Sequence, residues 1–198
     1  MPTIFTHAIT SAAFGQLVPA RDRTERFWFW SIFCSMLPDA DVMGFGFGIR
    51  YGDFLGHRGF THSLLFAALV GILVARFGGS ASANPSGGSA SQCIPARRNP
   101  PYVLPMYFAL VTASHGLLDA MTDGGLGIAF FSPFDTTRYF LPWRPIHVSP
   151  IGPRFFSDRG LNVLLSEAQW IWLPSAVLAA AAWISRRRAK SARAPMSA

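Results

Sequence analysis

Five apolar stretches alternate with short polar or glycine-rich segments along this chain. They cover about residues 4–20, 27–37, 63–75, 102–118 and 161–185. Apolar runs of this kind are typical of helices that are buried in a protein core or in a lipid bilayer. The first run is short for a full membrane crossing, because a helix rises by only about 1.5 Å per residue. The pattern predicts an all-α bundle of about four or five apolar helices.

The residues beside these runs predict where the helices begin and end. Thr6 is a candidate N-cap of the first helix, and Pro19 closes it. Thr61 is a candidate cap of a helix that begins near His62. Residues 124–160 are rich in proline, glycine and aromatic residues, which predicts a long irregular segment.

The composition places this bundle in a membrane. Hydrophobic residues make up 51% of the 198 residues and charged residues only 14%, about half of what a soluble domain carries. The mean hydropathy is +0.30. We therefore expect residues 1–198 to form a single membrane-embedded domain, interrupted by a disordered Gly/Ser/Pro-rich linker at residues 78–101. The two cysteines lie in an apolar run and in this linker, so a disulfide framework is excluded.

The formal charge of +7 is segregated along the chain. Residues 21–26, 76–101 and 186–198 hold eleven of the 17 Lys and Arg residues, but only two of the ten acids. Positive segments stay in the cytoplasm, which predicts a multi-pass inner-membrane protein with a basic cytoplasmic tail at residues 186–198. Alternating spans then place all five histidines at the non-cytoplasmic face. Since topology explains the arginines, we expect the lipid bilayer as partner and no nucleic acid.

Polar residues with metal-binding chemistry lie at the ends of the apolar runs. His115 and Asp119 are four residues apart, so their side chains lie one turn apart on one helix face. Imidazole and carboxylate ligands suit Zn²⁺, with manganese as the alternative. Asp39 and Asp41 follow Pro38 at the end of an aromatic run, where unpaired carboxylates would be costly at the membrane rim.

The segment from His57 to Ser63 concentrates further polar groups in seven residues. His57 and His62 are five residues apart, which suits a loop followed by a helix better than a single helix. Together these positions predict a centre of one or two divalent ions. The candidate metal ligands are His7, Asp39, His57, His62, His115 and Asp119.

Three further residues are candidates for catalysis at this centre. Arg58 could hold a phosphate through bidentate contacts, and either Asp41 or Asp123 could act as general base. Structural interpretations stay open for the candidate ligands and the catalytic candidates alike. The histidines and carboxylates could form a hydrogen-bonded network between packed helices, and Arg58 could anchor a lipid headgroup.

The motifs also resemble those of a known family. Thr6-His7, Pro38-Asp39-x-Asp41, His57-Arg58-Gly59-x-Thr61-His62-Ser63 and His115-x-x-x-Asp119 look like the YdjM-like family, over residues 3 to 150. Its members are bacterial and archaeal proteins described as LexA-regulated or LexA-binding, inner-membrane-associated metal-dependent hydrolases. A link to LexA is thus implied by the resemblance alone.

A looser similarity exists to zinc-dependent phospholipase C and the related single-strand nucleases. That likeness implies that Asp39, His62, His115 and Asp119 are metal ligands and that a phosphodiester is the substrate. This chain departs from those proteins because its helices are far more apolar and its acids are few.

These observations favour a membrane-bound metal-dependent hydrolase that acts on a phosphoester, such as a lipid or lipid-linked phosphate. Two alternatives belong to other classes. One is a non-enzymatic membrane protein with a structural metal or His–Asp network. The other is a small transporter, which would need its polar residues at the middle of the bilayer rather than at the ends of the apolar runs.

Overall fold

The structure is a computed structural model that describes residues 1–77, 100–150 and 155–191. Within these ranges every regular element is helical, so the predicted all-α class is confirmed for the described residues. The predicted linker at 78–101 lies outside them except for its last two residues. The predicted basic tail at 186–198 is described only to Ser191, where it continues the last helix.

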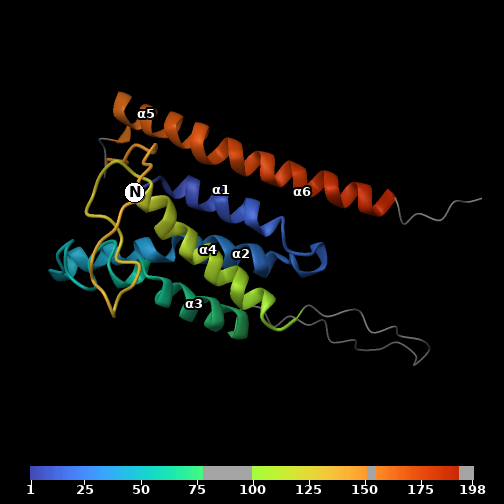
Figure 1. Ribbon diagram of the computed structural model, residues 1–198, viewed down its shortest axis with the longest axis horizontal. Helices are drawn as coiled ribbons and strands as arrows, with labels where there is room; N and C mark the ends of the chain where they lie inside the picture. Colours follow the sequence, from blue (N-terminus) through green and yellow to red (C-terminus); the bar gives the residue numbers. More distant parts are fainter. Residues whose placement is uncertain (78–99, 151–154, 192–198) are drawn as a thin grey trace, which may run out of the picture.

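Four helices pack side by side, and a long C-terminal helical stretch lies along one edge (Figure 1). The strongest packing joins α3 to α4, while α1 lies between α2 and the C-terminal stretch. That stretch runs from α5 through one π-helical turn into α6. The helices are α1 (Ile4–Gly15), α2 (Glu25–Met36), α3 (Leu64–Phe77), α4 (Val103–Ala120), α5 (Asp158–Glu167), η5 (Ala168–Trp172) and α6 (Leu173–Ser191).

Two of the described helices are long and apolar enough to cross a membrane, Val103–Ala120 and Asp158–Ala189. The helices α1, α2 and α3 have 12, 12 and 14 residues, whereas a span takes about 20. Length therefore does not support the expected four or five spans, and that number stays a prediction. Only 22% of the apolar window in the C-terminal stretch is buried within the protein, which leaves the rest of it available to lipid.

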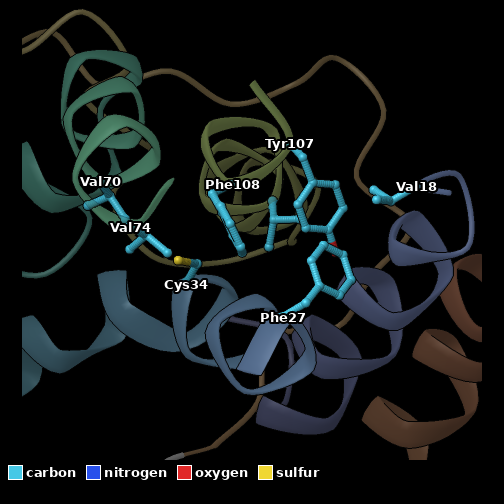
Figure 2. Packing of buried hydrophobic residues seen from close by; sticks show 8 residues of the cluster. Val18, Phe27, Cys34, Val70, Val74, Tyr107 and Phe108 are labelled. Atoms are coloured by element: carbon cyan, nitrogen blue, oxygen red, sulfur yellow. The ribbon is translucent and has the colours of Figure 1, made fainter. Parts of the chain in front are cut away.

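The core lies where α2, α3 and α4 meet (Figure 2). Phe27 stacks on Tyr107 with ring centroids 4.8 Å apart, and Phe108 packs beside them. The Tyr107 hydroxyl reaches Ser31 Oγ at 2.9 Å, so its polar end is satisfied inside the core. This core fixes α4 as the central helix of the bundle.

A glycine allows the close approach of α3 and α4. A Cβ atom at Gly71 would lie 2.5 Å from the Pro105 carbonyl oxygen and 2.6 Å from the Ala109 backbone nitrogen. We expect Gly71→Ala to lower the free energy of unfolding by about 1–3 kcal/mol, because backbone atoms cannot move aside as a side chain can. Denaturation of the detergent-solubilised protein measures this.

The matched control is Gly46→Ala. A Cβ atom at Gly46 meets nothing within 4 Å, so this variant gains helix propensity without a clash. Equal stability of the two variants would show that the α3–α4 contact is not limiting.

The polar motifs gather at one end of the bundle. Figure 1 shows the first residues of α1 and α3 and the last residues of α2 and α4 at this end. Two irregular segments close it, residues 37–63 and 121–150, which we call the cap. The cap includes η2 (Leu37–Phe47) and η3 (Phe60–His62). At the opposite end Arg23 and Arg186 both donate to Gln16, so basic side chains are separated from the cap.

The N-cap of the first helix lies three residues earlier than predicted. Thr3, not Thr6, is the N-cap of α1, and a carboxylate from the C-terminal stretch satisfies the helix start. Glu167 is fully buried and accepts hydrogen bonds from Thr3 N and Thr3 Oγ1, both at 2.5 Å, and from Thr6 Oγ1 at 2.7 Å. A negative charge is favourable at a helix N-terminus, so Glu167 stabilises the start of α1 and joins it to the C-terminal helical stretch.

The start of α3 also differs from the expectation. The helix begins at Leu64, and Ser63 Oγ accepts the Phe66 N–H at 3.1 Å. Thr61 instead lies in η3, where its hydroxyl donates to Asp41 at 2.6 Å. The prediction that Thr61 is the N-cap of this helix is therefore wrong, because its hydroxyl donates to the Asp41 carboxylate instead.

Candidate metal centre

Four predicted ligands from three elements meet where the cap covers the bundle. Asp39 comes from η2, His62 from η3, and His115 and Asp119 from the last turns of α4. One ligand atom of each lies within 4.8 Å of those of the others. We call these four residues the His–Asp cluster. Their two nitrogen and two oxygen donors form a set that a tetrahedral zinc ion accepts.

Burial differs within the cluster. His115 and Asp119 are 0% exposed and His62 is 3% exposed, whereas the Asp39 side chain keeps 17% of its surface accessible. Any approach from solvent or lipid therefore lies on the Asp39 side.

The hydrogen bonds of His115 define its tautomer. Its Nδ1 lies 2.7 Å from the Ser35 carbonyl oxygen, which can only accept, so Nδ1 carries the proton. In the neutral ring Nε2 is then a lone pair, and it faces Asp39 Oδ1 at 3.1 Å. Two acceptors at this distance repel each other unless a proton or a metal ion lies between them. Metal-binding histidines commonly donate their other nitrogen to a carbonyl in this way.

His62 repeats this arrangement. Its Nδ1 lies 3.1 Å from Thr61 Oγ1 and 3.3 Å from Asp41 Oδ2. Its buried Nε2 has no hydrogen bond and lies 3.6 Å from Asp39 Oδ1 and 3.5 Å from Asp119 Oδ2. Burial by itself lowers the pKa of His62, but the surrounding carboxylates outweigh it and raise the pKa to about 10. The position thus strongly attracts a cation.

The carboxylate of Asp119 is buried without a hydrogen bond to either oxygen. Its one ionic neighbour among the arginines is Arg58, with Nε 3.2 Å from Oδ2. Buried polar atoms nearly always have a hydrogen-bond partner, so several atoms without one at the same place indicate a binding site for a ligand. In the described part of the chain they include His7 Nδ1 and Nε2, Arg58 Nε, His62 Nε2, and Asp119 Oδ1 and Oδ2. Those that carry lone pairs, His62 Nε2 and the Asp119 oxygens, fit a bound divalent ion, whereas the Arg58 Nε–H faces Asp119 Oδ2.

His7 lies directly against the cluster. Its ring stacks on His115 with centroids 3.8 Å apart, and the residue is 1% exposed. Neither of its ring nitrogens has a hydrogen-bond partner. Its ligand atoms do not join the group of four, so binding of the ion by His7 stays a prediction.

A second group overlaps the first, consisting of Asp41, His57 and His62. His57 Nδ1 lies 2.8 Å from Asp41 Oδ1 and 3.9 Å from Asp39 Oδ1. Burial opposes ionisation of Asp41, but hydrogen bonds from His57 and His62 outweigh it and lower its pKa to about 2. Asp41 is therefore a carboxylate at neutral pH.

Comparison with known proteins agrees with the family resemblance of the motifs. The sequence profile of the YdjM inner membrane protein family matches residues 1–191. The chain belongs to this family. A relative, inner membrane protein YbcI of Escherichia coli (strain K12), is 36% identical over 188 residues, which cover 94% of this chain and 100% of the relative. No solved structure matches the chain. The resemblance and the inner-membrane location are confirmed.

Arg58 of this YdjM-family chain is turned into the protein. The residue is 0% exposed, and its guanidinium donates to the Gly124 carbonyl at 2.8 Å and to Thr122 Oγ1 at 3.0 Å. Its backbone adopts φ 64°, which is costly for a residue with a Cβ atom. These contacts favour a role in fixing Asp119 and the cap, and the predicted phosphate contact stays a prediction.

Asp123 of the YdjM-family chain lies apart from the His–Asp cluster. Its carboxylate accepts hydrogen bonds from His147 Nδ1 and from the Val148 N–H, both at 2.8 Å. The side chains of Asp123 and His147 are 44% and 57% exposed. Its predicted role as general base is not tested by this placement, but the structure does not bring it to the ligands.

Proposed function

We propose that this inner-membrane protein is a divalent-metal-dependent hydrolase that acts on phosphoesters. One observation carries the proposal. The Nε2 atoms of His62 and His115 both face carboxylate oxygens in a buried space, and a bound cation would stabilise this arrangement. Zinc fits the mixed nitrogen and oxygen donors best, with manganese as the alternative.

Such an ion, when bound, lowers the pKa of a water molecule and stabilises charge on a phosphoryl oxygen. Asp39 lies at the accessible side of the cluster, so the substrate would enter there. Asp41 accepts a hydrogen bond from His57, and Asp123 accepts one from His147. To act as general base, either carboxylate would have to break its hydrogen bond to the histidine.

The surface of the cap supports a lipid or lipid-linked substrate. Large apolar side chains of the cap and its surroundings are exposed, including Phe47 at 86%, Phe134 at 88% and Phe156 at 90%. Large apolar side chains exposed in such numbers favour contact with a lipid surface. A phosphate on a lipid would reach Asp39 by lateral diffusion. We further propose a multi-pass topology with the basic end in the cytoplasm and the cap at the non-cytoplasmic face.

A structural metal is the second candidate, and burial favours it. Three of the four cluster residues are exposed by 3% or less, so an ion there could serve to fasten the cap to α4. This candidate predicts loss of folding when ligands are removed, and no turnover.

Hydrolysis of bis-p-nitrophenyl phosphate and of phosphatidic acid in mixed micelles tests the proposal on protein saturated with Zn²⁺ or Mn²⁺. We expect Asp39→Asn to reduce turnover by at least about 100-fold while the protein remains folded, a loss typical of groups that stabilise the transition state. Asp135→Asn, an exposed cap carboxylate that contacts Thr137 and Tyr139, is the control and should retain full turnover. Metal-saturated wild type that hydrolyses neither compound would overturn the hydrolase and favour the structural ion.

A further inference from the structure

Asp41 is the point at which three donors of the cap converge. Its Oδ1 lies 2.8 Å from His57 Nδ1, and its Oδ2 lies 2.6 Å from Thr61 Oγ1 and 3.3 Å from His62 Nδ1. The Thr61 Oγ1 atom also lies 3.1 Å from His62 Nδ1. The Asp41 side chain is 1% exposed. Both oxygens are thus engaged inside the protein, and neither faces open space.

The chemistry of these contacts assigns the protons. An ionised carboxylate can only accept, so Nδ1 of His57 carries a hydrogen atom. The Thr61 hydroxyl donates to Asp41, so its oxygen accepts from Nδ1 of His62 at 3.1 Å, and that nitrogen carries a hydrogen atom too. In the neutral, metal-binding form of His62 the lone pair is then on Nε2, the atom that faces Asp39 and Asp119. Asp41 does for His62 what the Ser35 carbonyl does for His115. Each histidine of the cluster has its outer nitrogen held so that its inner nitrogen can bind.

A second ion between Asp41 and His57 fits the distances less well. Two ligands of one zinc ion at about 2.0–2.1 Å stand about 3.3 Å apart in a tetrahedral site. The 2.8 Å between His57 Nδ1 and Asp41 Oδ1 is a hydrogen-bond length instead. The Thr61 hydroxyl already occupies the other oxygen of Asp41.

We infer that the centre takes a single divalent ion, held by the His–Asp cluster, and that Asp41 is a positioning residue which, together with the Thr61 hydroxyl that it holds, fixes the Nδ1–H of His62. The inference rests on the metal binding of the proposed function but not on hydrolysis. It makes His57 a neighbour held by Asp41 rather than a ligand. Carboxylate–histidine–metal arrangements of this type are a regular feature of metal sites.

Titration of the metal-free, detergent-solubilised full-length protein with CoCl₂ tests the inference. Both the stoichiometry and the visible absorption of bound Co²⁺ are recorded. Wild type should bind one equivalent. Asp41→Asn should bind one equivalent with about 10–100-fold lower affinity and an unchanged spectrum at saturation, because an outer partner is lost while all four ligands remain. His57→Gln should also bind one equivalent with the wild-type spectrum.

Several outcomes would overturn the inference. Two equivalents in wild type, one of them lost in His57→Gln, would establish a second ion in the Asp41 group. Unchanged affinity in Asp41→Asn would exclude the positioning role. If Asp41→Asn does not fold, the His57→Gln stoichiometry still decides between one ion and two. Wild type that binds one ion and hydrolyses no phosphoester would overturn the hydrolase and leave this inference standing.

Discussion

Replacement of His115 and Asp119 together by alanine is expected to abolish metal binding. These residues supply two of the four ligands, and both are fully buried at the centre of the cluster. The affinity should fall by more than about 100-fold, beyond the loss caused by an outer partner alone. Elemental analysis of the purified protein should find about one equivalent of zinc or manganese in wild type and none in the double variant.

A control with the same two residue types separates ligand loss from general damage. The variant His147→Ala/Asp135→Ala removes an exposed histidine and an exposed carboxylate of the cap and should keep its metal. Circular dichroism confirms that the helices remain. A double variant of His115 and Asp119 that still holds a full equivalent of metal would contradict the assignment of these ligands.

Loss of the Arg58 side chain should have the largest effect on stability. Arg58→Met removes the guanidinium that pairs with Asp119 and donates to Thr122 and Gly124. A buried carboxylate that loses its partner costs about 3–5 kcal/mol, so the free energy of unfolding should fall by that amount. Chemical denaturation of the metal-free protein in detergent measures the change.

The control is Arg144→Met. The Arg144 guanidinium stacks on the half-buried Phe140 ring, 4.8 Å from its centroid, and forms no buried ion pair in the described structure. It should change stability by about 1 kcal/mol or less. A second variant, Arg58→Met/Asp119→Leu, removes both charges and should recover much of the loss. If Arg58→Met is as stable as the control, Arg58 does not anchor the cap, and its predicted phosphate contact gains support.

The chain pattern predicted the parts of the centre that depend on local geometry. His115 and Asp119 follow from helical spacing, and the convergence of Asp39 and His62 follows from polar motifs at the ends of antiparallel helices. The pattern overestimated the length of the first helix, because apolar residues continue beyond its hydrogen-bonded turns, whereas the other helices are as long as their apolar runs or longer. The first run was expected over residues 4–20, whereas α1 covers Ile4–Gly15.

Contacts between distant segments were not predictable in the same way. The Ser35 carbonyl that orients His115 is backbone, which leaves no trace in residue type. Arg58 meets residues about 65 positions later through the folded cap, and no periodicity encodes this. The predictions that Thr6 and Thr61 are helix N-caps were wrong for a related reason. Their hydroxyls donate hydrogen bonds to the carboxylates of Glu167 and Asp41, which are distant in sequence.

The order of the ligands along the chain has a consequence for biosynthesis. Asp39 and His62 are synthesised before α3, whereas His115 and Asp119 lie in the last turns of α4. A nascent chain that ends after α3 therefore holds only half of the proposed ligand set. The ion that we propose would bind only after α4 has been made and has packed against α2 and α3. Glu167, which joins the C-terminal stretch to the first residues, is synthesised later still.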